Sequence, residues 1–587
     1  MKKSYFLLAC ACALLTGCKH TSSSLEIRLN QVGFRPLQEK IATIDVYTAD
    51  AAPCSVAILS ETGDTVWTGM ASATMINPLS GKPRQLVDFS TLTTPGRYTL
   101  HLTPYTIHRD AVASFTISPR PYRELTRQAL RAFYYQRTAM PIDEPYAEGY
   151  PRPAGHPDTL VLMHASAATQ ERPENTIIAS SGGWYDAGDY NKYVVNSGYT
   201  MGVFLMAYEQ QSAYYDTLSL NIPESSLPVP DMLAEAMYNI RWMMTMQDTD
   251  GGVYHKLTNP EFEGFIRPDE CQKPRYVVLK TTAAALDFAA TMALAARVYA
   301  PYEHVYPRFV AEATAAALRA WEWALAHPAI YYDQNAMNQQ FGPAIITGAY
   351  DDYDVQGEFY WAATELYLLT RDQQYRDAAL AYCPTVFTPA TWGDVTELAS
   401  IEWMLHPQGV ETFAAQRQAD LLAHLQPYLD EAQTTSVHRS PYGNRAEDFF
   451  WGCNSEGCCW RGIECLYAYR LTGEDKYLVN AERCLNHVLG QNATGFCYVT
   501  GFGTRPTQDP HHRLSFSHPK GTLPGFLAGG PNRERQDEGI DGVSYPKNVP
   551  ADESYLDFQP SYASNEVTIN WNVTLFALTA GIDALQQ

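Results

Sequence analysis

The stretches ATELYLLTRDQQYRDAALAY (363–382) and LYAYRLTGEDKYLVNAERCL (466–485) decide the fold. In each stretch a helical pattern ends in Leu-Thr, a short polar turn follows, and a tyrosine (Tyr375 or Tyr477) opens the next helix. A helical hairpin that recurs along a chain is the unit of solenoids and of closed helical toroids. The sequence therefore predicts that the long C-terminal part of the chain is built from packed helical hairpins.

Helical spacing continues on the N-terminal side of these hairpins. In PDMLAEAMYNIRWMMTMQ (230–247), Leu233, Met237, Ile240 and Met244 recur at helical intervals after a Pro-Asp start. Further Ala-rich helices are predicted at 281–299, 309–326 and 358–369. Their wide apolar faces are typical of helices that pack against other helices.

Residues 25–118 have a different pattern, because their apolar stretches are short, β-branched or aromatic, and separated by Gly, Pro, Asp and Thr turns. Apolar and polar residues alternate in IRLNQVGF (27–34). Other strands are predicted in KIATIDVY (40–47), CSVAILS (54–60), TVWTGM (65–70), RYTLHL (97–102) and ASFTI (113–117). Several short strands in roughly a hundred residues predict an immunoglobulin-type β-sandwich.

The N-terminus has the features of a targeting segment. Two lysines precede an apolar run at 5–15 that is too short to span a bilayer. The run ends in Leu15-Thr16-Gly17-Cys18, which resembles a bacterial lipobox and implies cleavage before Cys18 and lipidation of its thiol. An ordinary secretory signal is the alternative. We expect residues 1–18 to be a lipoprotein signal peptide, 19–24 a polar tether, and the protein a secreted lipoprotein of a bacterial outer membrane, held there by its lipid anchor alone.

Composition excludes some classes of function. The 587 residues include 64 Asp and Glu against 42 Lys and Arg, a net charge of -22 with no basic stripe, which excludes a nucleic-acid-binding protein. The 39 tyrosines suit a sugar-binding cleft, because flat rings cover the apolar faces of sugars, although most Tyr side chains belong to cores. The length predicts more than one domain.

The cysteines give no clear pattern. Three of the 12 lie in the signal region, which leaves an odd number. Cys453, Cys458 and Cys459 cluster in WGCNSEGCCWRG (451–462), but their spacing is not that of a usual zinc site. Buried thiols or one disulfide are favoured over a metal.

Two aspartates stand in a glycine-rich loop, GGWYDAGDYNKY (182–193). Glycines let the backbone approach a ligand, and Asp186 and Asp189 together could hold one water molecule. A calcium loop or a capped turn is the alternative. This loop belongs to the long segment 141–192, and loops of that length inside a domain are usually functional.

Two further segments carry candidate chemistry, the second of them at the end of the long loop 500–565. Pro-His-His-Arg at 510–513 could bind sugar hydroxyls or a metal, or be an ordinary surface cluster. Glu566 follows Tyr-Ala-Ser-Asn and precedes the apolar C-terminal segment. It could be a helix N-terminal charge, or a carboxylic acid whose pKa is raised by apolar surroundings, as a general acid requires.

The order G-G-W-Y-D-A-G-D, P-H-H-R and N-E resembles glycoside hydrolase family 9, and the resemblance covers nearly the whole mature chain. Five further stretches resemble sequences that are typical of this family: DGGVYHK (250–256), RYVVLKTTAAALDFAA (275–290), EFYWAATELY (358–367), YVTGFGTRP (498–506) and PGFLAGGPN (524–532). IRLNQVGFRP (27–36) resembles the immunoglobulin-like module that often precedes this catalytic domain. The resemblance implies a multidomain fold: a β-sandwich over 25–118 and an all-α (α/α)6 toroid over 119–587, with an open substrate cleft.

The resemblance also implies roles for single residues. It makes Asp189 the general base, Asp186 the residue that helps hold the attacking water, and Glu566 the general acid. The other implied residues contact sugar: His511 and Arg513 bind hydroxyls, and Tyr562 and Trp184 line the cleft. No cofactor is needed for this chemistry.

Calcium is an open question. Many family members carry an Asp-Glu pair before the E-F-Y-W helix, whereas this chain has Gly357-Glu358. Asp352, Asp354 and Glu358 could still supply the oxygen ligands of a structural calcium.

The main hypothesis is an inverting endo-acting hydrolase of β-1,4-glucosidic bonds in β-glucan. The alternatives within enzymes are a xyloglucan or mixed-linkage glucan endo-hydrolase, or an exo-acting β-glucosidase. A non-catalytic glycan-binding lipoprotein is the alternative from another class. This alternative is disfavoured because a protein that no longer needed catalysis could have lost Asp189 or Glu566, and both residues are present.

Overall fold

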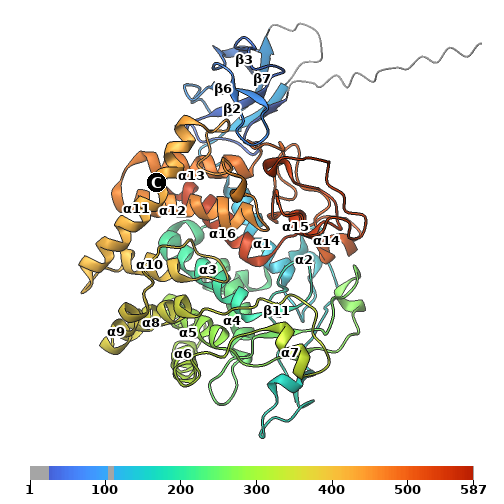
Figure 1. Cartoon of the computed structure of the whole chain (residues 1–587), viewed down its shortest axis with the longest axis vertical. Coiled ribbons are helices and arrows are strands. Elements are labelled where there is room, and N and C mark those ends of the chain that lie inside the picture. The colour runs from blue at the N-terminus through green and yellow to red at the C-terminus, as the bar shows by residue number, and fades with distance from the viewer. Residues whose placement is uncertain (1–25, 104–111, 586–587) are drawn as a thin grey trace, which may run out of the picture.

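The computed structural model describes residues 26–103 and 112–585. Figure 1 shows a small β-sandwich, in blue, at one end of the molecule, against the orange and red C-terminal part of a large helical domain. Cys18 and the rest of the predicted signal peptide and tether lie outside the described residues.

The sandwich consists of two antiparallel sheets in the described part of the chain, with strand orders β1-β2-β6-β5 and β4-β3-β7-β8. The strands are β1 (Ile27–Arg28), β2 (Ile41–Asp45), β3 (Ser55–Ser60), β4 (Thr65–Met70), β5 (Met75–Ile76), β6 (Pro83–Asp88), β7 (Gly96–Thr103) and β8 (Val112–Ile117). Phe34, Phe89 and Phe115 pack ring to ring between the sheets. The predicted sandwich is confirmed. β5 and β6 were not predicted; β6 begins with a proline, which lacks an N–H to donate and is tolerated at a strand start.

The segment 27–34 is a strand only at its first two residues. Asn30 ends it, because its side-chain oxygen accepts hydrogen bonds from the N–H groups of Val32 and Gly33 at 3.0 and 3.1 Å and so turns the chain. Its side-chain amide donates to Asn486 (2.8 Å) in the helical domain. The alternation in the sequence therefore marks the contact between the domains and not a long strand.

Six helices form an inner ring in the described part of the helical domain. They are α3 (Val194–Tyr215), α5 (Thr282–Tyr299), α8 (Gln356–Thr370), α10 (Thr396–Leu405), α12 (Trp460–Thr472) and α16 (Ile569–Ala584). Successive members pack together from α12 through α16, α3, α5 and α8 to α10. A 2.6 Å hydrogen bond from the Trp460 indole to Glu397 joins α12 to α10 and closes the ring.

One outer helix packs on each inner helix. The outer helices are α1 (Arg123–Gln136), α4 (Asp231–Thr245), α6 (Phe309–Ala326), α9 (Gln373–Tyr382), α11 (Glu411–Thr434) and α13 (Asp475–Val488). The two stretches that resemble each other form the hairpins α8–α9 and α12–α13, as predicted. This is the (α/α)6 arrangement, and the predicted fold class is confirmed.

The inner helices are buried on nearly all sides, which explains their continuous apolar sequences. The stretch Thr282–Tyr302, which contains α5, is apolar and long enough to cross a membrane, but α5 belongs to the inner ring, and 89% of the apolar 18-residue window in this stretch is buried. Its many alanines let α3, α6 and α8 approach it closely.

Loops at one end of the ring carry smaller elements. The sheet β10-β9-β13-β12-β11 is made of β9 (Val161–Met163), β10 (Ile177–Ile178), β11 (Lys192–Tyr193), β12 (Lys256–Thr258) and β13 (Tyr276–Val277). The short helices are α2 (Glu144–Ala147), α7 (Gln334–Gln340), α14 (Arg513–Ser517) and α15 (Tyr562–Asn565). The segments 141–192 and 500–565 were predicted as loops only, and pieces of two to five residues subdivide them: α2, β9 and β10 in the first, α14 and α15 in the second.

The cysteines of the described residues are all free thiols. Cys453 donates to the carbonyl of Pro531 at 3.2 Å and Cys458 to that of Cys484 at 3.3 Å. Of the interpretations offered for the 451–462 cluster, the structure corresponds to buried thiols.

The sandwich contacts α13 and the loops that follow it. Arg28 donates to the carbonyl of Ala493 at 2.6 Å, and Arg35 forms a buried ion pair with Glu482. Asn77 donates to Asp552 at 2.8 Å. The sandwich thus supports a loop region that leads directly to Glu566.

Candidate active site

A cavity of about 390 Å³ lies where the long loops meet the inner helices. Asp186, Asp189 and Glu566 all line it, although Glu566 is more than 370 positions from the other two. The aromatic residues of its wall are Tyr193, Phe262, Tyr350, Trp392, Trp451 and Trp571. The structure therefore brings together the three carboxyl groups predicted for catalysis.

Asp186 is buried and both of its oxygens accept hydrogen bonds. Asn196 on α3 donates to Oδ1 at 2.7 Å, and the Tyr350 hydroxyl donates to Oδ2 at 2.6 Å. Burial, together with the nearby carboxylate of Asp189, raises the pKa of Asp186 to about 8. The two hydrogen bonds thus hold its side chain in the cavity wall.

Asp189 has one oxygen that is held and one that is not. Asn191 and the Tyr193 hydroxyl donate to Oδ2 at 2.5 and 3.0 Å. Oδ1 has no hydrogen-bond partner among the described residues. A buried carboxylate oxygen without a partner is rare, and in a cavity wall it is positioned to bind a water molecule or a ligand hydroxyl.

Glu566 is held at the cavity by backbone contacts. It pairs with His511 in a parallel bridge, and the Gly529 N–H donates to its carbonyl at 2.9 Å. Burial is the main cause that raises the pKa of its carboxyl to about 8, with repulsion from Asp189 adding to it and Arg513 opposing it. The side chain therefore keeps its proton at neutral pH, as a general acid must.

Gly188 is the point where the aspartate loop (182–193) contacts the segment 511–513 and Glu566. A Cβ placed on Gly188 would lie 2.1 Å from the His511 carbonyl oxygen and 3.2 Å from Glu566 Oε1. Its own carbonyl accepts from the Arg513 N–H at 3.0 Å and from the Arg513 guanidinium at 2.8 Å. Glycine at this position lets the two catalytic segments come together.

His511 and Arg513 differ in what they can offer a substrate. Burial lowers the pKa of His511 to about 4, and its Nδ1 bonds the Gln559 carbonyl at 2.9 Å, so the neutral ring presents Nε2 as an acceptor. Arg513 is buried and donates to the carbonyls of Glu263 and Gly188 at 2.9 and 2.8 Å. These hydrogen bonds join the loop that contains Glu263 to the loop that contains Gly188.

Two residues were predicted to line the cleft. Tyr562 is partly buried beside His511 and packs 5.4 Å from Trp451, a cavity residue. The prediction that Trp184 lines the cleft is wrong. Its side chain is fully buried, packs against Phe133, and donates a hydrogen bond to Glu235 at 2.9 Å. The Gly-rich sequence around it is compatible with a core tryptophan because Gly183 packs directly against Trp242.

Sequence patterns gave no sign of two cavity residues. Tyr350 lies in a loop far from Asp186 in sequence, and only the fold brings its hydroxyl there. Glu456 belongs to a π-helical turn, Asn454–Cys459, where it accepts from Asn570 at 3.1 Å and burial raises its pKa to about 7. π-Helical turns are frequent at functional sites but have no clear sequence signature.

The predicted calcium site lies near the start of α8, where the structure gathers several carboxylates. Asp287, Asp352 and Glu358 are buried, and burial is the main cause that raises their pKa values. Repulsion from Asp352 adds to the rise for Asp287 and Glu358. Both oxygens of Asp287 lack hydrogen-bond partners in the described chain, and oxygen-only clusters suit a hard cation. Asp354 instead is exposed and accepts from the Gln356 N–H at 3.0 Å, at the start of α8. Calcium binding near α8 therefore stays a prediction.

The chain was compared with known proteins. It is 48% identical to a xyloglucan-specific endo-β-1,4-glucanase of Bacteroides ovatus over 95% of this chain and 94% of that one. It is 32% identical to a cellulose 1,4-β-cellobiosidase of Acetivibrio thermocellus over 95% and 67% of the two chains. A solved Bacteroides ovatus family 9 structure superposes with a TM-score of 0.89 at 46% identity, over 96% and 99% of the chains.

Two family matches divide the sequence as the structure does. Residues 22–106 match the cellulase N-terminal Ig-like domain, and residues 122–579 match glycosyl hydrolase family 9. The predictions of this family, of a sandwich followed by a helical catalytic domain, and of a glycoside hydrolase are confirmed. With its three cavity carboxyls on an (α/α)6 ring and a match over most of its length, this chain belongs to glycosyl hydrolase family 9.

Proposed function

We propose that this enzyme cleaves internal β-1,4-glucosidic bonds of xyloglucan with inversion of configuration. The xyloglucan substrate is supported by the 48% identity to a xyloglucan-specific endo-β-1,4-glucanase over nearly the full length of both chains. This favours the alternative substrate named from the sequence over unbranched β-glucan. The aromatic cavity wall is consistent with either, because flat rings pack against sugar faces.

The observation that carries the mechanism is the contrast between Glu566 and Asp189 in one cavity. Glu566 has a pKa raised to about 8 and keeps its proton, so it can protonate the departing glycosidic oxygen. Asp189 has a carboxylate oxygen with no partner among the described residues, so it can accept the proton of an attacking water. Two carboxyls in these roles make a water-mediated, inverting displacement.

Asp186 and His511 support this chemistry without carrying the proton. Asp186 is held by Asn196 and Tyr350, and it can orient the same water that Asp189 activates. His511 Nε2 can accept a hydrogen bond from a sugar hydroxyl near the cleavage point. Neither role needs a cofactor.

The predicted lipid anchor gives the proposed site of action. A lipidated Cys18 and a short tether would hold the catalytic domain at a bacterial outer membrane, where it would meet polysaccharide. The proposal rests on the lipobox-like sequence alone.

The substrate is tested by a product profile on xyloglucan, mixed-linkage glucan, carboxymethyl cellulose and short cello-oligosaccharides at equal mass concentration. We expect the highest kcat/KM on xyloglucan, with oligosaccharides of several lengths in the first products. A higher kcat/KM on an unbranched glucan, or release of one short product from chain ends, would contradict the substrate or the endo mode respectively.

A further inference from the structure

The cavity contains one carboxyl group that the proposed mechanism does not use. Among the described residues, Asp186, Asp189, Glu456 and Glu566 are the carboxyl-bearing residues that line it. Burial is the main cause that raises the pKa of Glu456 to about 7, and no charge of the other three carboxyls contributes to this rise. Glu456 therefore stands apart from the catalytic group, in another part of the cavity wall.

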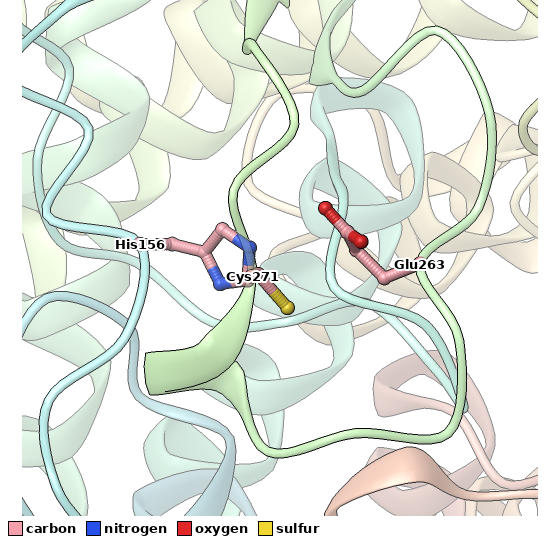
Figure 2. A group of neighbouring side chains, drawn as sticks. All are labelled: His156, Glu263 and Cys271. Carbon is pink, nitrogen blue, oxygen red and sulfur yellow. The ribbon is translucent and has the colours of Figure 1, made fainter.

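Glu263 is also close to the cavity along the chain, because it follows the cavity residue Phe262, but its side chain has other neighbours. Its carboxylate lies beside His156 and Cys271, and one atom from each of these three side chains lies within 4.8 Å of the others (Figure 2). Glu263 does not line the cavity. Unlike this buried glutamate, Glu456 offers its carboxyl group to a ligand in the cavity.

The π-helical turn Asn454–Cys459 positions Glu456. The first residue of the turn donates its N–H to the Gly529 carbonyl and its side-chain amide to the Ala528 carbonyl, both at 2.9 Å. The Gly529 N–H in turn donates to the Glu566 carbonyl at 2.9 Å. The turn that carries Glu456 is therefore connected through a single residue to the backbone of the general acid.

The Glu456 carboxyl is oriented by the start of α16. The Asn570 side-chain amide donates to Oε1 at 3.1 Å, and the Thr568 hydroxyl, 2.7 Å from Asn570 Oδ1, fixes the orientation of that amide. The Trp571 indole opposes the rise in the pKa of Glu456. A carboxylate can accept about four hydrogen bonds, and Glu456 is only half-buried, so it has capacity for ligand hydroxyls.

Two tryptophans line the cavity beside this turn. Trp451 is 42% exposed and packs 5.4 Å from Tyr562, between ring centres. Trp571 is held against Gly452, where an added Cβ would lie 2.7 Å from the indole nitrogen. An exposed indole face covers the apolar face of a sugar ring, and a nearby carboxylate accepts from the hydroxyls at the rim of that ring. The combination suits a glucosyl residue.

We propose that Glu456 is a substrate-binding residue that accepts hydrogen bonds from hydroxyls of a backbone glucosyl residue packed on Trp451, away from the bond that is cleaved. The inference rests on the proposed function, because it takes a β-glucan as the ligand. Glu456 then contributes affinity for the polysaccharide and takes no part in proton transfer. Hydrogen bonds to an ionised acceptor are roughly twice as strong as those between neutral groups, so its charge matters for this affinity.

The test compares Glu456→Gln with the wild type between pH 7 and 8, where Glu456 is mainly ionised and Glu566 mainly protonated. The substrate is the polysaccharide that the wild type cleaves with the highest kcat/KM. We expect KM to rise about five- to tenfold with kcat nearly unchanged, because the lost interaction is made equally in the ground state and the transition state. A short aryl glycoside, which does not reach beyond the cleavage point, should keep its wild-type KM.

Glu464→Gln is the matched control. Glu464 lies on α12, is buried, and has a pKa that burial raises to about 7, but it does not line the cavity. We expect this variant to keep the wild-type KM on both substrates. An equal rise in KM for Glu464→Gln would attribute the effect to replacing any buried glutamate and would overturn the proposal.

Binding without turnover gives a second measurement. Titration calorimetry with a long cello-oligosaccharide compares Glu566→Gln with the double variant Glu566→Gln/Glu456→Gln, and we expect the second change to weaken binding about five- to tenfold. An unchanged Kd, or a kcat for Glu456→Gln that falls as much on the aryl glycoside as on the polysaccharide, would overturn the role given to Glu456. The proposed function would stand in either case, whereas a wild type that cleaves no glucan would overturn that function itself.

Discussion

At the scale of single residues, three carboxyl groups in one cavity acquire different properties from their partners. Burial and repulsion raise the pKa of Glu566 and of Asp186 to about 8. The oxygens of Asp186 are occupied by Asn196 and Tyr350, whereas Asp189 keeps one oxygen free of any described partner. These differences support Glu566 as the acid, Asp186 as the positioning group and Asp189 as the base.

Glu566→Gln should leave the fold intact and lower kcat on xyloglucan by about 10²–10⁴-fold, because the amide keeps the shape of the side chain but cannot donate the proton. Kinetics on purified variant and wild type, with matched circular dichroism spectra, give the measurement. A folded variant with near wild-type turnover on the polysaccharide would remove Glu566 from the acid role.

The pH dependence follows from the raised pKa of Glu566. Below a pH of about 8 the carboxyl is protonated and active, and activity is lost as pH rises through that value. We therefore expect kcat/KM on xyloglucan to fall on the alkaline side with a midpoint near pH 8. An aryl glycoside with a good leaving group needs no protonation and should show a weaker alkaline fall. An identical fall for both substrates would point to another group.

The two aspartates should differ in the cost of replacing the carboxyl group with an amide. Asp189→Asn removes the proposed base, whereas Asp186→Asn removes a group that only orients water, so the first should lower kcat more than the second. Both variants keep the size of the side chain and can be compared under the same conditions. The reverse order would mean that the roles of the pair are exchanged.

At the scale of elements, Gly188 sets how closely the aspartate loop approaches His511 and Glu566. Gly188→Ala would place a methyl group 2.1 Å from the His511 carbonyl and must push the two segments apart. A displacement of about 1 Å between catalytic groups can cost on the order of 10²-fold in rate, so we expect a loss of that size in kcat/KM.

Gly264→Ala is the matched control for Gly188. A Cβ at Gly264 would meet nothing within 4 Å, and the residue does not line the cavity. It should retain wild-type kinetics. If Gly188→Ala also retains them, the close approach of the two segments is not needed for catalysis.

Helical elements could be predicted because their patterns are long and continuous. The intervals of Leu233, Met237 and Ile240 span α4. The helix predicted at 281–299 is α5, and Thr281 caps its N-terminus. The sheet β9–β13 could not be predicted, because strands of two or three residues contain too little pattern. The π-helical turn around Glu456 and the turn at Asn30 escaped prediction for a related reason: tertiary contacts determine them.

At the scale of the whole molecule, hydrogen bonds connect the sandwich to the loops that hold the catalytic residues. Asn77 in the sandwich donates to Asp552, five positions before Asp557. Asp557 in turn accepts from the N–H groups of Gln508 and Asp509, next to the His511 segment. The N-terminal domain thus contributes to holding the acid side of the cavity.

The site could be assigned from sequence only through family resemblance. The spacing of Asp186 and Asp189 was also compatible with a calcium loop, and Glu566 alone was compatible with a helix N-terminal charge. Trp184 shows that nearness in sequence does not predict which residues line the cavity, because this aromatic residue stands next to the catalytic aspartates in sequence and yet lies in the core. Burial depends on contacts from Glu235 and Phe133, which a local pattern does not contain.

The lipid anchor is a prediction for the whole cell-bound protein. Cys18→Ser should move the enzyme from the membrane fraction to the soluble fraction, because a diacylated and N-acylated cysteine carries enough hydrocarbon for stable retention and serine carries none. Fractionation of cells that express each form gives the measurement. A variant that remains membrane-bound would argue against lipidation at this residue.

The stereochemistry of the first product tests the central claim that Asp189 activates water while Glu566 donates a proton. Carboxyls that accommodate a water between them stand roughly 6.5–9.5 Å apart, and the displacement inverts the anomeric centre. Proton NMR in the first minutes of xyloglucan hydrolysis, before mutarotation, should therefore show the α-configured reducing end. Initial accumulation of the β-anomer would mean retention through a covalent intermediate and would contradict the assignment of Asp189 as the base.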